Sequence, residues 1–153
     1  MHVNRPGLSL RLAAFAVFSC LVAGQAWAAA GDCAPQVRDG WIRDPIGPMQ
    51  TMLAGYGRIE NPCPATVVVV GAESAAFADV SIHRTTVADG MSRMRAVPEL
   101  PIAPDDAAVL EPGGMHLMLM QPATTPVVGD HVRIDLRLQD GRRIQGDFVV
   151  RSP

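Results

Sequence analysis

The chain has 153 residues and a net charge of −2 at pH 7, from 13 basic and 15 acidic residues. Neither sign forms a run, so the charge pattern gives no reason to expect binding to nucleic acid or to a charged membrane surface. Without an N-terminal leader, about 120 residues remain, which is enough for one domain with one core and too few for two.

The first 30 residues have the organisation of a secretory signal peptide. Arg5 and Arg11 precede an apolar run over residues 12–23, and small residues follow it. We therefore expect residues 1–30 to be cleaved and residues 31–153 to form the exported domain. The apolar run is shorter than the roughly 20 residues that cross a bilayer, so no membrane span is expected in the mature protein.

The cysteines allow different interpretations. Cys20 raises a lipoprotein alternative, but the bulky Phe18 and the apolar stretch that continues after the cysteine disfavour lipidation. Cys33 and Cys63 remain after processing, and in an exported protein an even pair is most simply a disulfide. The alternative is a pair of thiol metal ligands, which ranks lower because neither cysteine belongs to a CxxC motif.

Short apolar segments between frequent prolines and glycines predict an all-β fold rather than long helices. The Asp140-Gly141 pair indicates a turn between the last two strands. In chain order we expect an early strand near residue 41, a loop at 45–48, and strands at 54–59, 65–73, 78–84, 108–110, 115–120 and 132–138, with a final strand after the turn.

Soft donor atoms gather in the segment MHLMLM, residues 115–120. Successive side chains of a strand point to opposite faces, so His116 and Met118 share one face about 6.7 Å apart, with Met120 beyond them. Upstream, His83 is expected at the end of a strand, and Met94 follows a turn at Asp89-Gly90. If these two segments are adjacent, two imidazoles and two thioethers converge.

The chemistry of this donor set favours monovalent copper. Thioether sulfur is soft and uncharged, which makes it a poor ligand for zinc or calcium and a good one for Cu(I), and imidazole accepts the same ion. Unlike thiolates, these ligands cannot be converted to a disulfide in an oxidising compartment.

The spacing resembles a known family signature. His83, ten residues, Met94, twenty-one residues, His116, one residue and Met118 match the H-x10-M-x21-H-x-M pattern of periplasmic copper chaperones of the PCuAC type at all four positions. The segments DGMSRMR and EPGGMHLMLM are also similar to the family's metal-binding segments.

This resemblance implies a cupredoxin-like Greek-key β-sandwich or barrel, located in the periplasm, that binds one Cu(I) per chain and is not an enzyme. It also implies a monomer that delivers copper to the CuA subunit of cytochrome c oxidase, alongside a Sco-type copper protein. General periplasmic copper storage or homeostasis is an alternative. The sequence departs from many members in lacking a His/Met-rich C-terminal tail, and Cys33 and Cys63 are not part of the signature.

Other interpretations remain for several residues and for the whole chain. Met91 is a candidate auxiliary thioether, and Met49 and Met52 follow a proline-rich loop that can line an access surface, although loose packing is a simpler interpretation. A blue-copper electron carrier requires a cysteine thiolate, and none follows Cys63. A purely structural sandwich would use the methionines for packing alone. An enzyme is the weakest alternative because neither a nucleophile elbow nor a phosphate-binding loop is present.

Overall fold

The structure is a computed structural model that describes residues 1–2 and 33–152. The chain divides into a unit at residues 1–31 and a unit at residues 32–153, and all of the strands belong to the second unit. The predicted cleavage region and Cys20 lie outside the described residues. Within the described part of the chain, no helix has the length and apolar character needed to cross a membrane.

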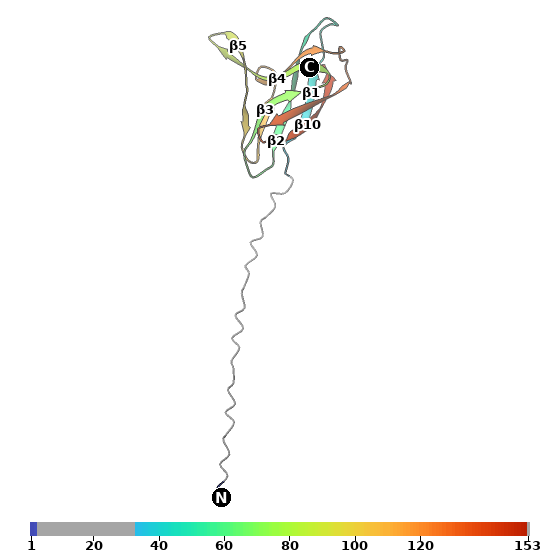
Figure 1. Cartoon of the computed structure of the whole chain (residues 1–153). Coiled ribbons are helices and arrows are strands. Elements are labelled where there is room, and N and C mark those ends of the chain that lie inside the picture. Colours follow the sequence, from blue (N-terminus) through green and yellow to red (C-terminus); the bar gives the residue numbers. More distant parts are fainter. Residues whose placement is uncertain (3–32, 153) are drawn as a thin grey trace. The chain divides into compact units, whose positions relative to one another are not determined.

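Ten strands make up the second unit (Figure 1). Their bounds are β1 Gln36–Arg43, β2 Met52–Asn61, β3 Val67–Glu73, β4 Phe77–Ala88, β5 Met91–Ala96, β6 Leu100–Ile102, β7 Asp106–Leu110, β8 Met115–Pro122, β9 His131–Leu138 and β10 Arg143–Arg151.

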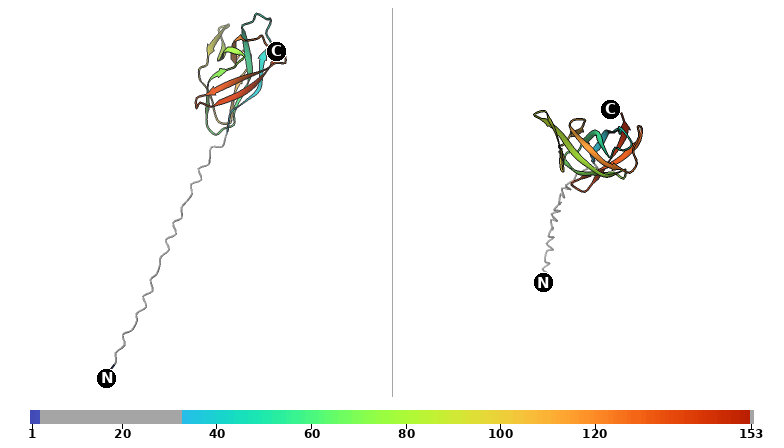
Figure 2. Two further views of the ribbon diagram at one scale, coloured as in Figure 1. Left: turned by 45° about the vertical axis from the view of Figure 1, so that its right-hand side comes forward. Right: turned by 90° about the horizontal axis from the view of Figure 1, so that it is seen from above.

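Seven of these strands close into a barrel. They are hydrogen-bonded in the order β4-β8-β2-β1-β10-β9-β3, and the pairing of β3 with β4 completes the ring (Figure 2). Three further strands are added to strands of this ring: β5 pairs with β4, β6 with β3, and β7 with β2. The β1–β10 pair is parallel and the other pairs are antiparallel. The predicted cupredoxin-like all-β fold is confirmed.

The core follows from the alternation of apolar and polar side chains along the strands. In β9, Val132, Ile134, Leu136 and Leu138 are all buried while the arginines between them are exposed. In β8, Leu117 and Leu119 are fully buried and fill the barrel interior. Because side chains alternate along a strand, the residues between these leucines lie on the opposite face.

The structure corrects the sequence prediction for β4, which was expected to end at residue 84, just after His83. The strand continues to Ala88, and its β-branched residues Thr85, Thr86 and Val87 favour this extended conformation. A two-residue turn then reverses the chain into β5. Asp89 and Gly90 both have positive φ, 53° and 73°, as a turn matched to strand twist requires. His83 therefore lies within a long hairpin.

The C-terminal end of β2 is held by a disulfide and by buried hydrogen bonds. Cys33 and Cys63 form the expected disulfide, with 5.6 Å between their Cα atoms. Beside it, the buried Asn61 receives a hydrogen bond on its Oδ1 from the amide of Cys63. The Asn61 amide nitrogen donates to the carbonyl oxygens of Ala65, Ile102 and Ala103 at 2.9, 3.0 and 3.0 Å. These bonds join the loops after β2 and β6.

Candidate metal site

The pairing of β4 with β8 brings the two histidines together. His83 and His116 are direct cross-strand partners, and their ring centroids lie 6.2 Å apart. Met118 lies opposite Ser81, two residues along the same pair of strands. Directly opposed residues share a face of the sheet, so both imidazoles and the thioether of Met118 lie on the face away from Leu117.

Met94 is supplied by the β4–β5 hairpin. It pairs with Thr85, which is on the same face of β4 as His83, so its side chain belongs to that face as well. Met94 is 48% exposed, and every residue of β5 is exposed. The hairpin therefore presents this thioether on the outside of the barrel rather than in the core.

A hollow of about 180 Å³ lies at this position. Met94, His116 and Met118 line it together, and so does Met52 at the start of β2. The remaining lining residues are Arg43, Gln50, Leu53, Ala54 and Tyr56. His83 is beside the hollow, opposite His116, but is not among the residues that line it.

The two imidazoles are held in different ways. His116 is 8% exposed, and its Nδ1 lies 3.2 Å from the carbonyl oxygen of Gly114. A hydrogen bond to that carbonyl requires the proton on Nδ1 and leaves Nε2 as the atom that can bind a metal. Tyr56 packs nearby, with 6.5 Å between the ring centroids, and limits the positions of the imidazole.

His83 is oriented by its own strand. Its Nε2 lies 3.2 Å from Ser81 Oγ, which in turn donates to Asp79 at 3.3 Å. Burial lowers the pKa of His83 below its ordinary value of 6.5, and the neighbouring His116 lowers it further, whereas Asp79 acts in the opposite direction. The ring is therefore biased toward its neutral form, which is the form that coordinates metals.

The structure thus places all four residues of the sequence signature on one side of neighbouring strands. Met91 pairs with Ala88 and faces away from Met94, so the candidate auxiliary thioether is on the other side of the hairpin. Within the described part of the chain, no group of three or more His, Cys, Asp or Glu side chains could hold a metal ion. The possible metal ligands on this side of the barrel are therefore the thioethers of Met94 and Met118 and the imidazoles of His83 and His116.

Sequence reasoning gave Met52 only as a loop residue that can line an access surface, with loose packing as the simpler interpretation, and did not include it among the metal ligands. The strand prediction began at residue 54, which left Met52 in a loop without a defined direction. Its placement depends on the pairing of β2 with β8, in which Met52 is opposite Met120. The only signal in the sequence was the position of Met52 two residues before Ala54, on the same face of an extended strand.

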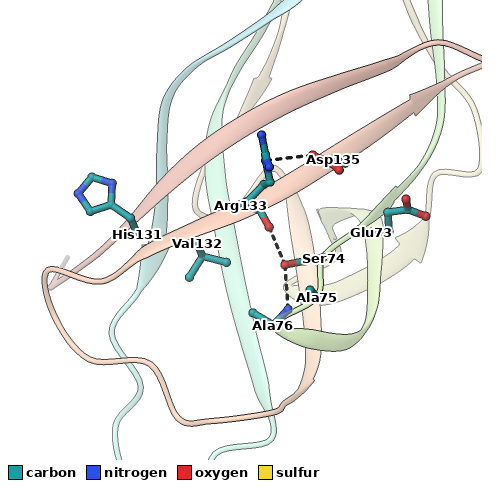
Figure 3. Close-up of a pocket in the computed structure, with 8 residues that line it drawn as sticks. All are labelled: Glu73, Ser74, Ala75, Ala76, His131, Val132, Arg133 and Asp135. Atoms are coloured by element: carbon teal, nitrogen blue, oxygen red, sulfur yellow. Dashed lines mark hydrogen bonds and ion pairs between the residues drawn. The ribbon is translucent and has the colours of Figure 1, made fainter.

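A larger hollow, of about 520 Å³, lies between the end of β3 and the start of β9 (Figure 3). Its polar groups bind one another: Ser74 Oγ donates to the carbonyl of Arg133 at 2.6 Å, and Arg133 lies 3.8 Å from Asp135. His131 at its rim is bound to Asp147 at 2.7 Å. No methionine or cysteine is among its lining residues. It lacks the soft donors of the hollow beside His116.

Comparison with solved structures supports the fold. The solution structure of apo-DR1885 from Deinococcus radiodurans has a TM-score of 0.62 at 25% identity, covering 100% of this chain and 95% of that chain. The CuI-DR1885 structure from the same organism gives 0.60 at 27% identity, covering 83% and 85%. The copper-bound PCuAC domain from PmoF2 gives 0.63 at 20% identity, covering 76% and 92%, and shows the fold alone. The resemblance to PCuAC domains is confirmed.

Sequence comparison gives the family. "Putative lipoprotein Lxx21020" of Leifsonia xyli subsp. xyli (strain CTCB07) is 31% identical over 107 residues, which cover 69% of this chain and 63% of that protein. The chain therefore spans less than two thirds of this relative's length. A family model described as "Putative lipoprotein LpqE-like" matches residues 35–150. The matching structures include copper-bound forms, and the matching sequences are named as lipoproteins. None of these names describes an enzyme, in line with the expected non-enzymatic protein. The chain belongs to the LpqE-like family.

Proposed function

We propose that this protein is an exported copper chaperone that binds one Cu(I) with His83, Met94, His116 and Met118 and passes it to another copper protein. The observation that carries the proposal is the direct pairing of His83 with His116, with both thioethers on the same face. Within residues 33–152, His83 and His116 are the only two histidines that lie on strands paired with each other.

The donor set suits a carrier better than a permanent site. Its ligands are all neutral, so the ion keeps its positive charge, and thioethers bind Cu(I) without releasing a proton. Met94 is on an exposed hairpin, and an acceptor can replace this ligand without unfolding the barrel. Ligand exchange at an open edge is the chemistry that metal delivery requires.

The relatives support both copper and export. DR1885 is named in a CuI form and the PmoF2 domain in a copper-bound form. The family and the Leifsonia relative are named as lipoproteins, which supports an exported protein with residues 1–30 as signal and residues 31–153 as the copper-binding domain. The family name also gives new weight to lipidation at Cys20, and we keep that as an alternative to a freely soluble periplasmic product.

The CuA subunit of cytochrome c oxidase, with a Sco-type protein, is the acceptor system that the PCuAC resemblance suggests. A blue-copper role fits less well, because the two cysteines of the described residues are joined in a disulfide and offer no thiolate. Transfer is tested by mixing the Cu(I)-loaded protein with a metal-free CuA domain and measuring copper in each after separation. Copper that stays with this chain under conditions that load the acceptor from free Cu(I) would favour storage over delivery.

Binding is tested by Cu(I) titration against a competing chelator. Wild-type protein is expected to bind one ion per chain, and Met118→Leu is expected to weaken binding at least about tenfold through loss of one thioether. The matched control is Met115→Leu, on the same strand but the opposite face, which should retain wild-type affinity. Equal affinity of both variants and wild type would refute the proposed site.

A further inference from the structure

Met52 occupies a position that the four-residue signature does not explain. It starts β2, and the pairing of β2 with β8 places it opposite Met120 and places Ala54 opposite Met118. All four side chains therefore lie on the face that carries His116. The small side chain of Ala54 leaves the space between Met52 and Met118 unfilled, and the hollow beside His116 opens there.

The exposure of Met52 also needs an explanation. The side chain is 46% exposed, although the other face of the same strand buries Leu53 at 3%. Met52 thus adds little to the core and presents its flexible thioether to the hollow instead. It lines that hollow together with Met94, His116 and Met118, so three thioethers and one imidazole border the same space.

The backbone around Met52 is held in place. Gln50 donates from its side-chain amide to the carbonyl of Met52 at 2.7 Å and accepts a hydrogen bond from the amide of Ile46 at 2.8 Å. The amide of Gln121, next to Met120, donates to the carbonyl of Thr51 at 2.7 Å. These bonds fix the start of β2 beside β8, so the thioether is delivered to the hollow by a structured backbone.

We propose that Met52 is a fifth donor of the site, which binds Cu(I) together with Met94, His116 and Met118 when His83 is not coordinated. This inference rests on the proposed Cu(I) function. The exchange replaces one neutral donor, the His83 imidazole, by another, the Met52 thioether. The ion stays monovalent, and no electron is transferred. Because Cu(I) accepts both donor types, either arrangement holds the ion at this site, so His83 can detach from the ion before an acceptor takes the copper.

The test compares Cu(I) affinities of the full chain in two backgrounds, using competition with a Cu(I) chelator. In the wild-type background, Met52→Leu is expected to have a small effect because His83 remains available. In a His83→Ala background, Met52→Leu should weaken binding about tenfold further. Met49→Leu is the matched control, since Met49 lies three residues earlier, is 90% exposed and does not line the hollow. Leucine preserves side-chain volume, and thermal unfolding of the metal-free variants confirms their folding.

Equal affinities for His83→Ala and His83→Ala/Met52→Leu would overturn the role of Met52. X-ray absorption of the His83→Ala variant gives an independent readout, because Met52 binding predicts three sulfur neighbours where two would otherwise remain. This failure is distinct from failure of the proposed function. If Met118→Leu weakens binding while Met52→Leu never does, the four-residue site stands and only the fifth donor is refuted.

Discussion

His83 and His116 face each other across β4 and β8, with 6.2 Å between their ring centroids. The two residues are 33 positions apart in the chain, and it is the sheet that makes them neighbours. A cross-strand pair on a closed barrel has little freedom to separate, so both imidazoles are held close to one position before an ion arrives. Restricting the ligands in advance reduces the entropy lost on binding.

Met94 provides the first prediction. Met94→Leu is expected to weaken Cu(I) binding about tenfold or more, because it removes a thioether from the face of the sheet that carries His83 and His116. Its effect on the free energy of unfolding without metal should be within about 0.5 kcal/mol, since the side chain is 48% exposed. Chelator competition and urea unfolding measure the two quantities. Met91→Leu, on the other face of the same strand, is the control and should leave affinity unchanged.

The disulfide gives a prediction in which stability and metal binding separate. Cys33 and Cys63 close a loop with a sequence separation of 30 residues, so replacing both by serine should lower the free energy of unfolding by about 3 kcal/mol. Met52 begins β2 beside the site, whereas Cys63 follows the other end of that strand. The Cu(I) affinity of the folded protein should therefore not change. Calorimetry and chelator competition test this, and a large loss of affinity in folded protein would show that the two ends are coupled.

Asn61 gives a second stability prediction. Its side chain is 1% exposed and bonds to the backbone of Ala65, Ile102 and Ala103 and to the amide of Cys63. Asn61→Ala removes these partners and leaves buried backbone groups unsatisfied, which should cost about 2–3 kcal/mol. Urea denaturation measures the loss. A variant as stable as wild type would mean that water replaces the amide at this position.

The turn between β9 and β10 gives a pH prediction. The backbone amide and then the side chain of Arg142 hydrogen-bond to Asp140, and they lower the pKa of this carboxyl below its ordinary value of 3.8. A lowered folded-state pKa favours the charged form, so this contribution to stability is present above 3.8 and is lost as the pH falls through the folded-state value. An NMR titration of the Asp140 carboxyl should give a midpoint below 3.8, and a midpoint at or above it would contradict the hydrogen-bonded turn.

Much of the fold could be predicted because alternation is visible in the sequence. The alternation of residues 115–120 between the two faces of the strand follows directly from strand periodicity, and so do the buried residues of β9. The turns at Asp89-Gly90 and Asp140-Gly141 carry their own signals, and both connect paired strands.

What could not be predicted is the partner of each strand. The end of β4 was misplaced because Arg84 to Ala88 lack an apolar alternation, and their conformation comes from pairing with β5. Met52 was left in a loop for the same reason: only its register with Met120 gives it a direction. Residues that are far apart in the chain acquire a common site through sheet pairing, which a single sequence records weakly.

The most direct test of the copper site is X-ray absorption at the copper edge of protein loaded with one equivalent of Cu(I). The account predicts a monovalent ion with both sulfur and imidazole nitrogen neighbours, two of each in the wild type, and one sulfur fewer in Met118→Leu. A spectrum without sulfur neighbours, or one that Met118→Leu leaves unchanged, would contradict it.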